Sequence, residues 1–176
     1  MSKRHGLIVI GYPGIGKTTV ANADKPYSKI IDLESSVFTI ENDKIENWYI
    51  PYCKMAVDIA SQGYIVLVSS HAKVQHELGF YNPDRNDITI VSISPTVFIK
   101  DEWINRLRDR YLNDKTPKNE RAWKQAEKFY IDDIHALSTN PDFSHIYLPN
   151  EHYDLYKIIM SIYDIYSNDR RQGIVE

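Results

Sequence analysis

The stretch that decides the fold is LIVIGYPGIGKTT, residues 7–19. Residues 7–10 form a compact, mostly β-branched run that is typical of a buried strand. Residues 11–18 then fit the pattern G-x-x-x-x-G-K-[ST] at every fixed position. A glycine-rich turn between a strand and a helix is the alternative interpretation, but a strand before the pattern and a helix-compatible run after it are the context that the pattern requires. Residues 11–18 are therefore predicted to be a phosphate-binding loop, the phosphate loop.

The residue types of the phosphate loop each have a chemical reason. Glycines let the backbone curl so that its N–H groups point inward and form a nest for an anion at the start of a helix. Lys17 adds a mobile positive charge for β- and γ-phosphates, and the hydroxyl of Thr18 is the expected ligand of Mg²⁺. ATP and Mg²⁺ are thus the expected cofactors. The residues expected to bind the nucleotide are Gly11, Gly14, Ile15, Gly16, Lys17, Thr18 and Thr19.

Short apolar runs alternate with amphipathic segments along the rest of the chain. Further strands are predicted at residues 29–33, 64–69, 88–93 and 144–148. Helical spacing of apolar residues is found at residues 41–61, 100–113, 119–137 and 150–167. Because Pro51 lies inside the first of these segments, a kink or two separate helices are expected there. Strands that alternate with helices predict an α/β fold with a parallel sheet covered on both faces.

Length and composition restrict the class of protein. The 176 residues suit a single domain, residues 1–176, and the mix of 43% hydrophobic and 26% charged residues excludes a disordered or low-complexity chain. The net charge of −3 gives no general attraction to nucleic acid or to an anionic membrane, so neither is expected as a partner. A single cysteine excludes an internal disulfide and a thiolate metal cluster. The apolar run at residues 7–10 is too short for a signal or a membrane span, so we expect a cytoplasmic monomer or homodimer.

Two acidic residues come after the second predicted strand. Side chains two apart on a strand point the same way, so Asp32 and Glu34 are expected to face the carboxyl end of the sheet, where ligands bind in open α/β folds. We expect Thr18 and Asp32 to hold the metal. Solvated turn acids are the alternative interpretation of both carboxylates.

Arginines are concentrated in one predicted helix. Three of the eight arginines lie at positions 106, 108 and 110, and Arg106 and Arg110 are four apart, hence on one helix face. A guanidinium matches the oxygens of a migrating phosphoryl group, so these two residues are candidate catalytic groups of a short lid at about residues 104–120. Pairing with Glu102 and Asp114 on the helix surface is the alternative, although exposed pairs contribute only about 0.3–0.5 kcal/mol.

The acceptor is expected to bind beside the second and third strands. Aromatic residues at positions 38–52 supply faces on which a nucleobase stacks, although packing of a helix onto the sheet is the alternative for each ring. His71 comes after the third strand and is a candidate for the pocket or simply the first residue of a helix. Arg85 is a candidate cation for an acceptor phosphate. The candidate acceptor residues are Glu34, Ser35, Phe38, His71 and Arg85.

The first strand, the phosphate loop and the order of the later strands and helices resemble the P-loop nucleoside and nucleotide kinases, which include adenylate-kinase-like, shikimate-kinase-like and phage deoxynucleotide-kinase-like enzymes. The resemblance is specific in the first 40 residues and architectural afterwards. It implies a three-layer P-loop NTPase fold with a five-stranded parallel sheet of order 2-3-1-4-5 and an arginine-bearing lid.

Two details of the resemblance concern the carboxylates. Asp32 and Glu34 look like the D-x-D element of shikimate-kinase-like enzymes, in which the first acid helps hydrated Mg²⁺ and the second contacts the acceptor hydroxyl. Glutamate at the second position departs from that element. The third strand ends in Ser69, where adenylate-kinase-like enzymes usually have an aspartate, so Asp32 is the better metal candidate.

These features predict an ATP- and Mg²⁺-dependent phosphotransferase that acts on a small molecule. The main interpretation is a nucleoside monophosphate or nucleoside kinase, and a shikimate- or gluconate-type metabolite kinase is the alternative. A nucleotide-binding regulator or weak NTPase is the alternative from another class. The residues expected to carry catalysis are Lys17, Asp32, Arg106 and Arg110.

Overall fold

A single parallel sheet organises the protein. The computed structural model describes residues 5–24, 29–40, 43–81, 87–150 and 152–172. The sheet has the order β2-β5-β1-β6-β7, which is 2-3-1-4-5 when only its own strands are numbered, and every pairing is parallel. Its strands are β1 (Gly6–Gly11), β2 (Ile30–Asp32), β5 (Ile65–Ser69), β6 (Ile88–Pro95) and β7 (Ser144–Leu148). The predicted sheet order is thereby confirmed.

The centre of the sheet is built from the continuous apolar runs seen in the sequence. All residues of β1 are buried, because β1 lies between β5 and β6 and is covered by helices on both faces. Leu7 of β1 lies opposite Ile65 of β5 and Thr89 of β6. A strand that is buried on both faces is apolar throughout instead of alternating, which explains these runs.

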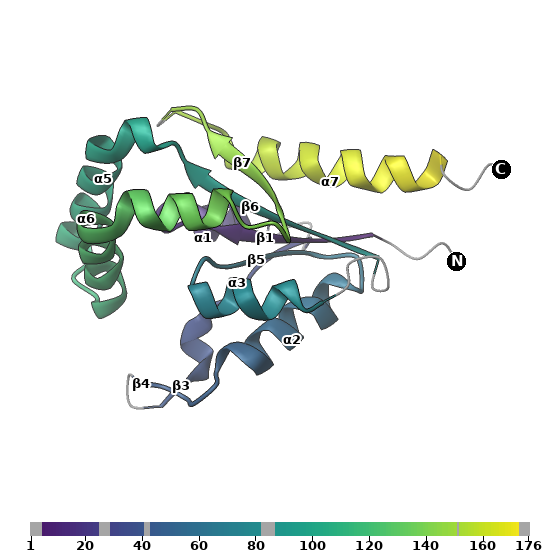
Figure 1. Cartoon of the computed structure of the whole chain (residues 1–176), viewed down its shortest axis with the longest axis horizontal. Helices are drawn as coiled ribbons and strands as arrows, with labels where there is room; N and C mark the ends of the chain where they lie inside the picture. Colours follow the sequence, from purple (N-terminus) through teal and green to yellow (C-terminus); the bar gives the residue numbers. More distant parts are fainter. Residues whose placement is uncertain (1–4, 25–28, 41–42, 82–86, 151, 173–176) are drawn as a thin grey trace.

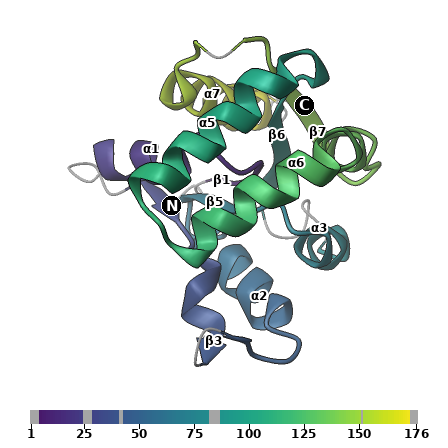
Figure 2. The ribbon, with the colours of Figure 1, turned by 90° about the vertical axis from the view of Figure 1, so that its left-hand side faces the viewer.

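Helices form a layer on each face of the sheet. Figure 1 shows α2 and α3 on one side and α7 on the other, and Figure 2 shows α1 on the same side as α7. The helices are α1 (Lys17–Ala23), α2 (Tyr49–Ala60), α3 (Ala72–Gly79), α5 (Lys100–Asn113), α6 (Pro117–Ser138) and α7 (Leu155–Gln172). Short 3₁₀ turns, η1 (Ser35–Phe38) and η2 (Val97–Ile99), and a small antiparallel pair, β3 (Thr39–Ile40) and β4 (Asp43–Lys44), complete the described elements.

The helix kinks do not lie where the sequence predicts them. The kink expected at Pro51 is absent, because Pro51 lies in the first turn of α2, where its missing N–H removes no helical hydrogen bond. A kink occurs in α6 instead, at Phe129, whose φ of −130° and ψ of 17° are not helical. At this point Tyr130 turns into the core, where its ring packs edge-on against Tyr12 and its hydroxyl donates to the carbonyl of Thr96.

The carboxyl ends of the strands point toward the helical pair α5 and α6. In Figure 1 this pair stands at the left-hand end of the sheet, and the turn between the two helices projects away from it. The phosphate loop comes directly after β1 at the same end. Among the described residues, no helix combines the length and the apolar character needed to cross a membrane.

Candidate active site

The phosphate loop is curled in the way its glycines allow. Gly14 and Gly16 have φ values of 87° and 98°, which residues with a Cβ rarely adopt, and Gly16 caps the start of α1. A Cβ on Gly11 would lie 2.6 Å from Cδ1 of Ile15, so a larger residue here would displace the end of that side chain. Nζ of Lys17 donates to the carbonyl of Gly11 at 2.8 Å, so the ammonium lies back against the loop.

Two side chains from distant elements hold the loop in place. Nε1 of the buried Trp103 in α5 donates to the carbonyl of Pro13 at 3.0 Å. The hydroxyl of Tyr153, which precedes α7, donates to the carbonyl of Ile15 at 3.0 Å. The rings of Trp103 and Tyr153 stack with centroids 6.2 Å apart. Sequence reasoning missed both residues, because their partners in the loop are 90 and 138 positions away.

The loop meets the end of β2 through one short hydrogen bond. Oγ1 of Thr18 donates to Oδ2 of Asp32 at 2.6 Å. The end of β2 is fixed by Tyr52, whose hydroxyl donates to the carbonyl of Leu33 at 2.8 Å and accepts from the amide of Ser69 at 2.9 Å. Tyr52 thereby ties the carboxyl ends of β2 and β5 together and sets the position of Asp32.

The pair of Thr18 and Asp32 fits a magnesium site. A hydroxyl and a carboxylate oxygen are hard ligands of the kind that Mg²⁺ selects, and Mg²⁺ in nucleotide sites usually takes its remaining ligands from water and phosphates. Within the described part of the chain, no group of three or more His, Cys, Asp or Glu side chains is arranged to hold a metal. Thr18 and Asp32 are residues that could hold Mg²⁺ here.

The charge on Lys17 is held in an unfavourable environment. Burial lowers the pKa of Lys17 from 10.5 to about 8, because the ammonium is removed from water. The charges of Lys118 and Arg110 lower this pKa further, whereas Asp32 and Glu34 raise it. All four side chains thus lie within electrostatic reach of Lys17. A polyphosphate bound in the loop would restore the stability of the ammonium.

Arg110 is positioned by the first turn of α6. Its Nε donates to Oδ1 of Asn119 at 2.6 Å. The buried Asn119 in turn donates through Nδ2 to the backbone carbonyl and to the carboxylate of Asp114. These contacts fix Arg110 in the last turn of α5, close enough for its charge to act on Lys17.

Arg106 has different surroundings. Its guanidinium carbon lies 4.9 Å from the ring centroid of Trp103 and 5.5 Å from that of Tyr153. These are cation–π distances, and both rings hold the phosphate loop. Arg106 therefore lies beside the loop on aromatic faces, so it and Arg110 have different neighbours although they share a helix face. Their predicted catalytic roles stay predictions.

An ion pair between Lys118 and Glu34, which the sequence did not reveal, lies beside the Thr18–Asp32 pair. Nζ of Lys118, in the first turn of α6, lies 2.7 Å from Oε1 and 2.5 Å from Oε2 of Glu34. Because 84 positions separate the two residues, no local pattern could have paired them. Lys118 lies inside the predicted lid, in which the cluster of arginines indicated the candidate cations.

The remaining candidate acceptor residues are distributed around an aromatic cluster. Ser35 and Phe38 belong to η1, and the ring of Phe38 packs edge-on against the buried Tyr52 at 5.8 Å. The buried Trp48 contacts both Tyr52 and His71. These rings thus pack against one another, as the alternative interpretation expected.

Three further candidates lie at different places around the loop and the sheet. His71 precedes α3 and accepts a hydrogen bond at Nδ1 from the amide of Lys73, which makes it the capping residue of that helix. Thr19 lies exposed on α1, next to the loop. Arg85 lies outside the described residues.

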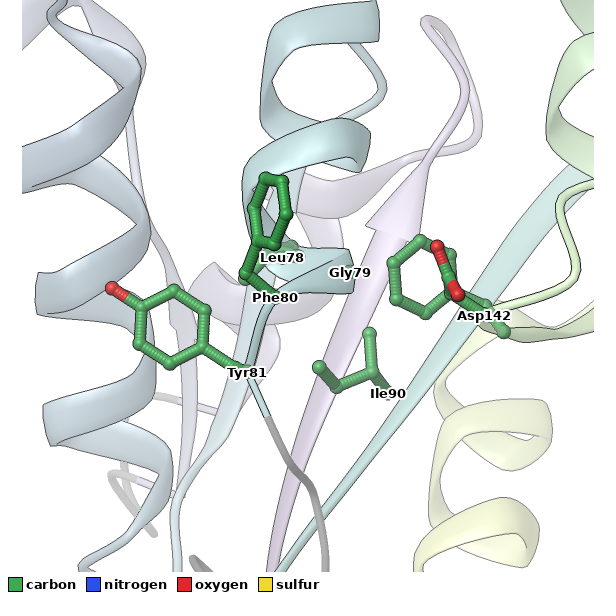
Figure 3. A pocket seen from close by; sticks show the side chains of 7 residues that line it. Leu78, Gly79, Phe80, Tyr81, Ile90 and Asp142 are labelled. Carbon is green, nitrogen blue, oxygen red and sulfur yellow. The ribbon is translucent and has the colours of Figure 1, made fainter.

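The described surface includes a groove at the phosphate loop and a hollow elsewhere. A groove of about 530 Å³ runs beside α1 and β2, and the side chains at its loop end are Thr18, Asp32 and Glu34. A second hollow of about 380 Å³ lies between the end of α3 and the start of β7, near the amino-terminal end of the sheet (Figure 3). Apolar side chains and Asp142 line the second hollow, which contains none of the predicted site residues. The groove is the one that adjoins the phosphate loop.

Comparison with known proteins identifies the fold. No protein-family model and no curated protein matches the sequence. Among solved structures, a gluconokinase from Sinorhizobium meliloti 1021 aligns over 99% of both chains with a TM-score of 0.59 and 10% identity. A shikimate kinase from Acinetobacter baumannii in complex with shikimate aligns over 99% of this chain and 97% of its own, with a TM-score of 0.49 and 12% identity.

The sheet order and the phosphate loop define a nucleotide-binding α/β domain of the P-loop type. Within that class, the chain shares its fold with the gluconokinase, as the full-length alignment shows. The fold class predicted from the sequence is confirmed.

Proposed function

We propose that this protein transfers a phosphoryl group from ATP, with Mg²⁺, to a hydroxyl group of a small metabolite. The observation that carries the proposal is the meeting of four groups at one end of the sheet: the phosphate loop, the Thr18–Asp32 pair, Glu34 and the cations of the α5–α6 turn. Phosphoryl transfer requires little beyond positioning and the neutralisation of charge, and these groups supply both.

The residues have distinct roles in this proposal. The loop amides and Lys17 bind the β- and γ-phosphates, while Arg110 and Lys118 add positive charge from the lid side. Bound Mg²⁺ would neutralise charge on the phosphates, and Thr18 and Asp32 would hold it. Glu34, two residues beyond Asp32, would accept a hydrogen bond from an acceptor hydroxyl. The groove of about 530 Å³ has the size of a small-ligand site.

A metabolite hydroxyl is now favoured over a nucleoside monophosphate as the acceptor, which reverses the preference drawn from the sequence. The aromatic rings that suggested base stacking are largely used for packing, since Trp48 and Tyr52 are buried. A gluconokinase, moreover, is among the structural neighbours that align over the full length. A nucleotide-binding regulator stays the candidate from another class, because β5 ends in Ser69 and offers no second carboxylate for a metal.

One assay separates these candidates. ATP consumption is measured with gluconate, shikimate, nucleosides and nucleoside monophosphates, for the unaltered protein and for Lys17→Ala. We expect stimulation by a hydroxylated metabolite that depends on Lys17. Stimulation only by a nucleoside monophosphate would support the alternative kinase, and no stimulation by any acceptor would support the regulator.

A further inference from the structure

The ion pair between Glu34 and Lys118 joins the two sides of the site. Glu34 lies just beyond β2 and caps the start of η1, whereas Lys118 is the second residue of α6. Both carboxylate oxygens lie within hydrogen-bond distance of Nζ, at 2.5 and 2.7 Å. Figure 2 looks onto the end of the sheet at which these segments lie. The contact therefore links the predicted lid to the edge of the sheet.

This ion pair contributes little to the stability of the fold. The side chains of Lys118 and Glu34 are 55% and 36% exposed. Ion pairs with this exposure contribute about 0–1 kcal/mol, because water and salt screen them. The ammonium of a lysine is also a compact charge with three rotatable donors, so it exchanges one oxyanion for another with little rearrangement. The pair is thus easily opened by a competing anion.

The position of the Glu34–Lys118 pair defines which charged groups an incoming anion would contact. Glu34 lines the groove together with Asp32 and Thr18, on the β2 side of the metal pair. An anionic molecule that enters there has two carboxylates as neighbours, and both disfavour its charge. Lys118 is the cation in direct contact with Glu34, so its positive charge favours an acceptor that carries a negative group.

We propose that Lys118 recognises an oxyanion of the acceptor and that Glu34 occupies the place of that oxyanion until the acceptor arrives. This inference rests on the proposed function and adds the substrate class: a hydroxylated molecule with a carboxylate or phosphate. When the acceptor's oxyanion takes over Lys118, the carboxylate of Glu34 is released and accepts a hydrogen bond from the acceptor hydroxyl. Lys118 is a binding residue in this scheme, and no bond is made or broken by it.

Binding is tested without turnover. The complex with Mg-ADP is titrated with three matched pairs, gluconate and sorbitol, shikimate and its methyl ester, and AMP and adenosine, while amide NMR signals are monitored. At least one anionic member should shift the signals of Glu34 and Lys118 and bind more tightly than its neutral partner. Lys118→Met should reduce that affinity about tenfold or more, the value of one charge-assisted hydrogen bond.

A matched control is present on the same helix. Nζ of Lys124 lies 2.6 Å from Oε1 of Glu120, so Lys124→Met removes the same kind of ion pair from α6 away from the site. This variant should retain the affinity and the preference for the anion. The inference is overturned if no anionic member of a pair binds at residues 34 and 118 more tightly than its neutral partner, or if Lys118→Met and Lys124→Met have equal effects.

Exchange of the charges separates recognition from structure. In the double variant Glu34→Lys with Lys118→Glu the ion pair is retained, but the cation lies just beyond β2 and the carboxylate on the lid. We expect the melting temperature to match that of the unaltered protein, while KM for the anionic acceptor rises about tenfold or more. Full recovery of KM in the double variant would overturn the inference. Failure of every acceptor to stimulate ATP consumption would instead contradict the proposed function, and the titration would still decide the role of Lys118.

Discussion

The hydroxyl of Thr18 donates a hydrogen bond of 2.6 Å to the carboxylate of Asp32, and this bond joins the phosphate loop to the end of β2. A second carboxylate, Asp24, lies at the other end of β2. It is buried and accepts hydrogen bonds from the amides of Lys29 and Ile30, at 2.8 and 2.7 Å. The two aspartates therefore frame one short strand, and only Asp32 faces the groove at the loop.

Asp32→Asn should lower kcat by roughly 10²-fold or more, the usual cost of removing one group that stabilises charge in the transition state, and should change the Kd for ATP much less. Steady-state kinetics and calorimetric titration with nucleotide measure the two effects. Asp24→Asn is the control, because it removes the charge from an acceptor of two backbone hydrogen bonds away from the loop, and it should lower the melting temperature without lowering kcat of the folded protein. An unchanged kcat in Asp32→Asn would remove Asp32 from the site.

The affinity for nucleotide should fall as the pH rises through about 8. The phosphates attract the ammonium form of Lys17, whose pKa is lowered to about 8 by burial, so above that pH binding must also recruit a proton. Arginine stays charged over the whole range, hence Lys17→Arg should bind Mg-ADP with a flatter pH dependence. Titrations from neutral pH to about pH 9.5 test this prediction. Identical profiles for the two proteins would contradict it.

Because the fold buries the charged Lys17, its replacement should make the nucleotide-free protein more stable. The pKa of Lys17 is about 8 in the folded state and 10.5 when unfolded, so between these values the unfolded chain binds more protons. The stability of the unaltered protein should therefore rise with pH in this window. Below the window, the full cost of burying the charged ammonium should be present. Lys17→Met removes the charge and should raise the melting temperature at pH 7. The gain over the unaltered protein should shrink as the pH approaches 10.5, and a constant gain would contradict the assignment.

Features that depend on neighbouring residues were predictable from the sequence. The phosphate loop, the positions of the five strands in the sheet and the bounds of α5 all result from local patterns, because burial on both faces requires continuous apolar runs and an amphipathic helix requires regular spacing. The sheet order came from the resemblance to P-loop kinases. The expectation that Asp32 faces the loop needed only the alternation of side chains along a strand.

Features that depend on the packing of distant segments were not predictable. The contacts of Trp103 with Pro13 and of Lys118 with Glu34 join positions 90 and 84 residues apart. No proline lies at the kink of α6 at Phe129, so the sequence does not indicate it. One sequence alone does not indicate such pairs, because several other lysines or aromatic residues could form the same contact with the same partner.

Tyrosine contacts to backbone carbonyls allow a matched test of how the phosphate loop is held. The hydroxyl of Tyr153 donates to Ile15 in the loop at 3.0 Å, and that of Tyr130 donates to Thr96, outside the loop, at 2.8 Å. Replacement by phenylalanine retains each ring and removes one hydrogen bond, so both variants should lose about 1 kcal/mol of stability.

Only Tyr153→Phe should also weaken the binding of Mg-ADP, because it alone leaves a loop carbonyl without its partner. The loss should be up to about tenfold, since some of the energy of one hydrogen bond goes into holding the loop in its binding conformation. Urea denaturation gives the stabilities of the two variants, and calorimetry gives their affinities. Equal losses of affinity in both variants would show that Tyr153 acts through the general stability of the fold. A loss confined to Tyr153→Phe would show that a residue preceding α7 sets the shape of a loop 138 positions earlier in the chain.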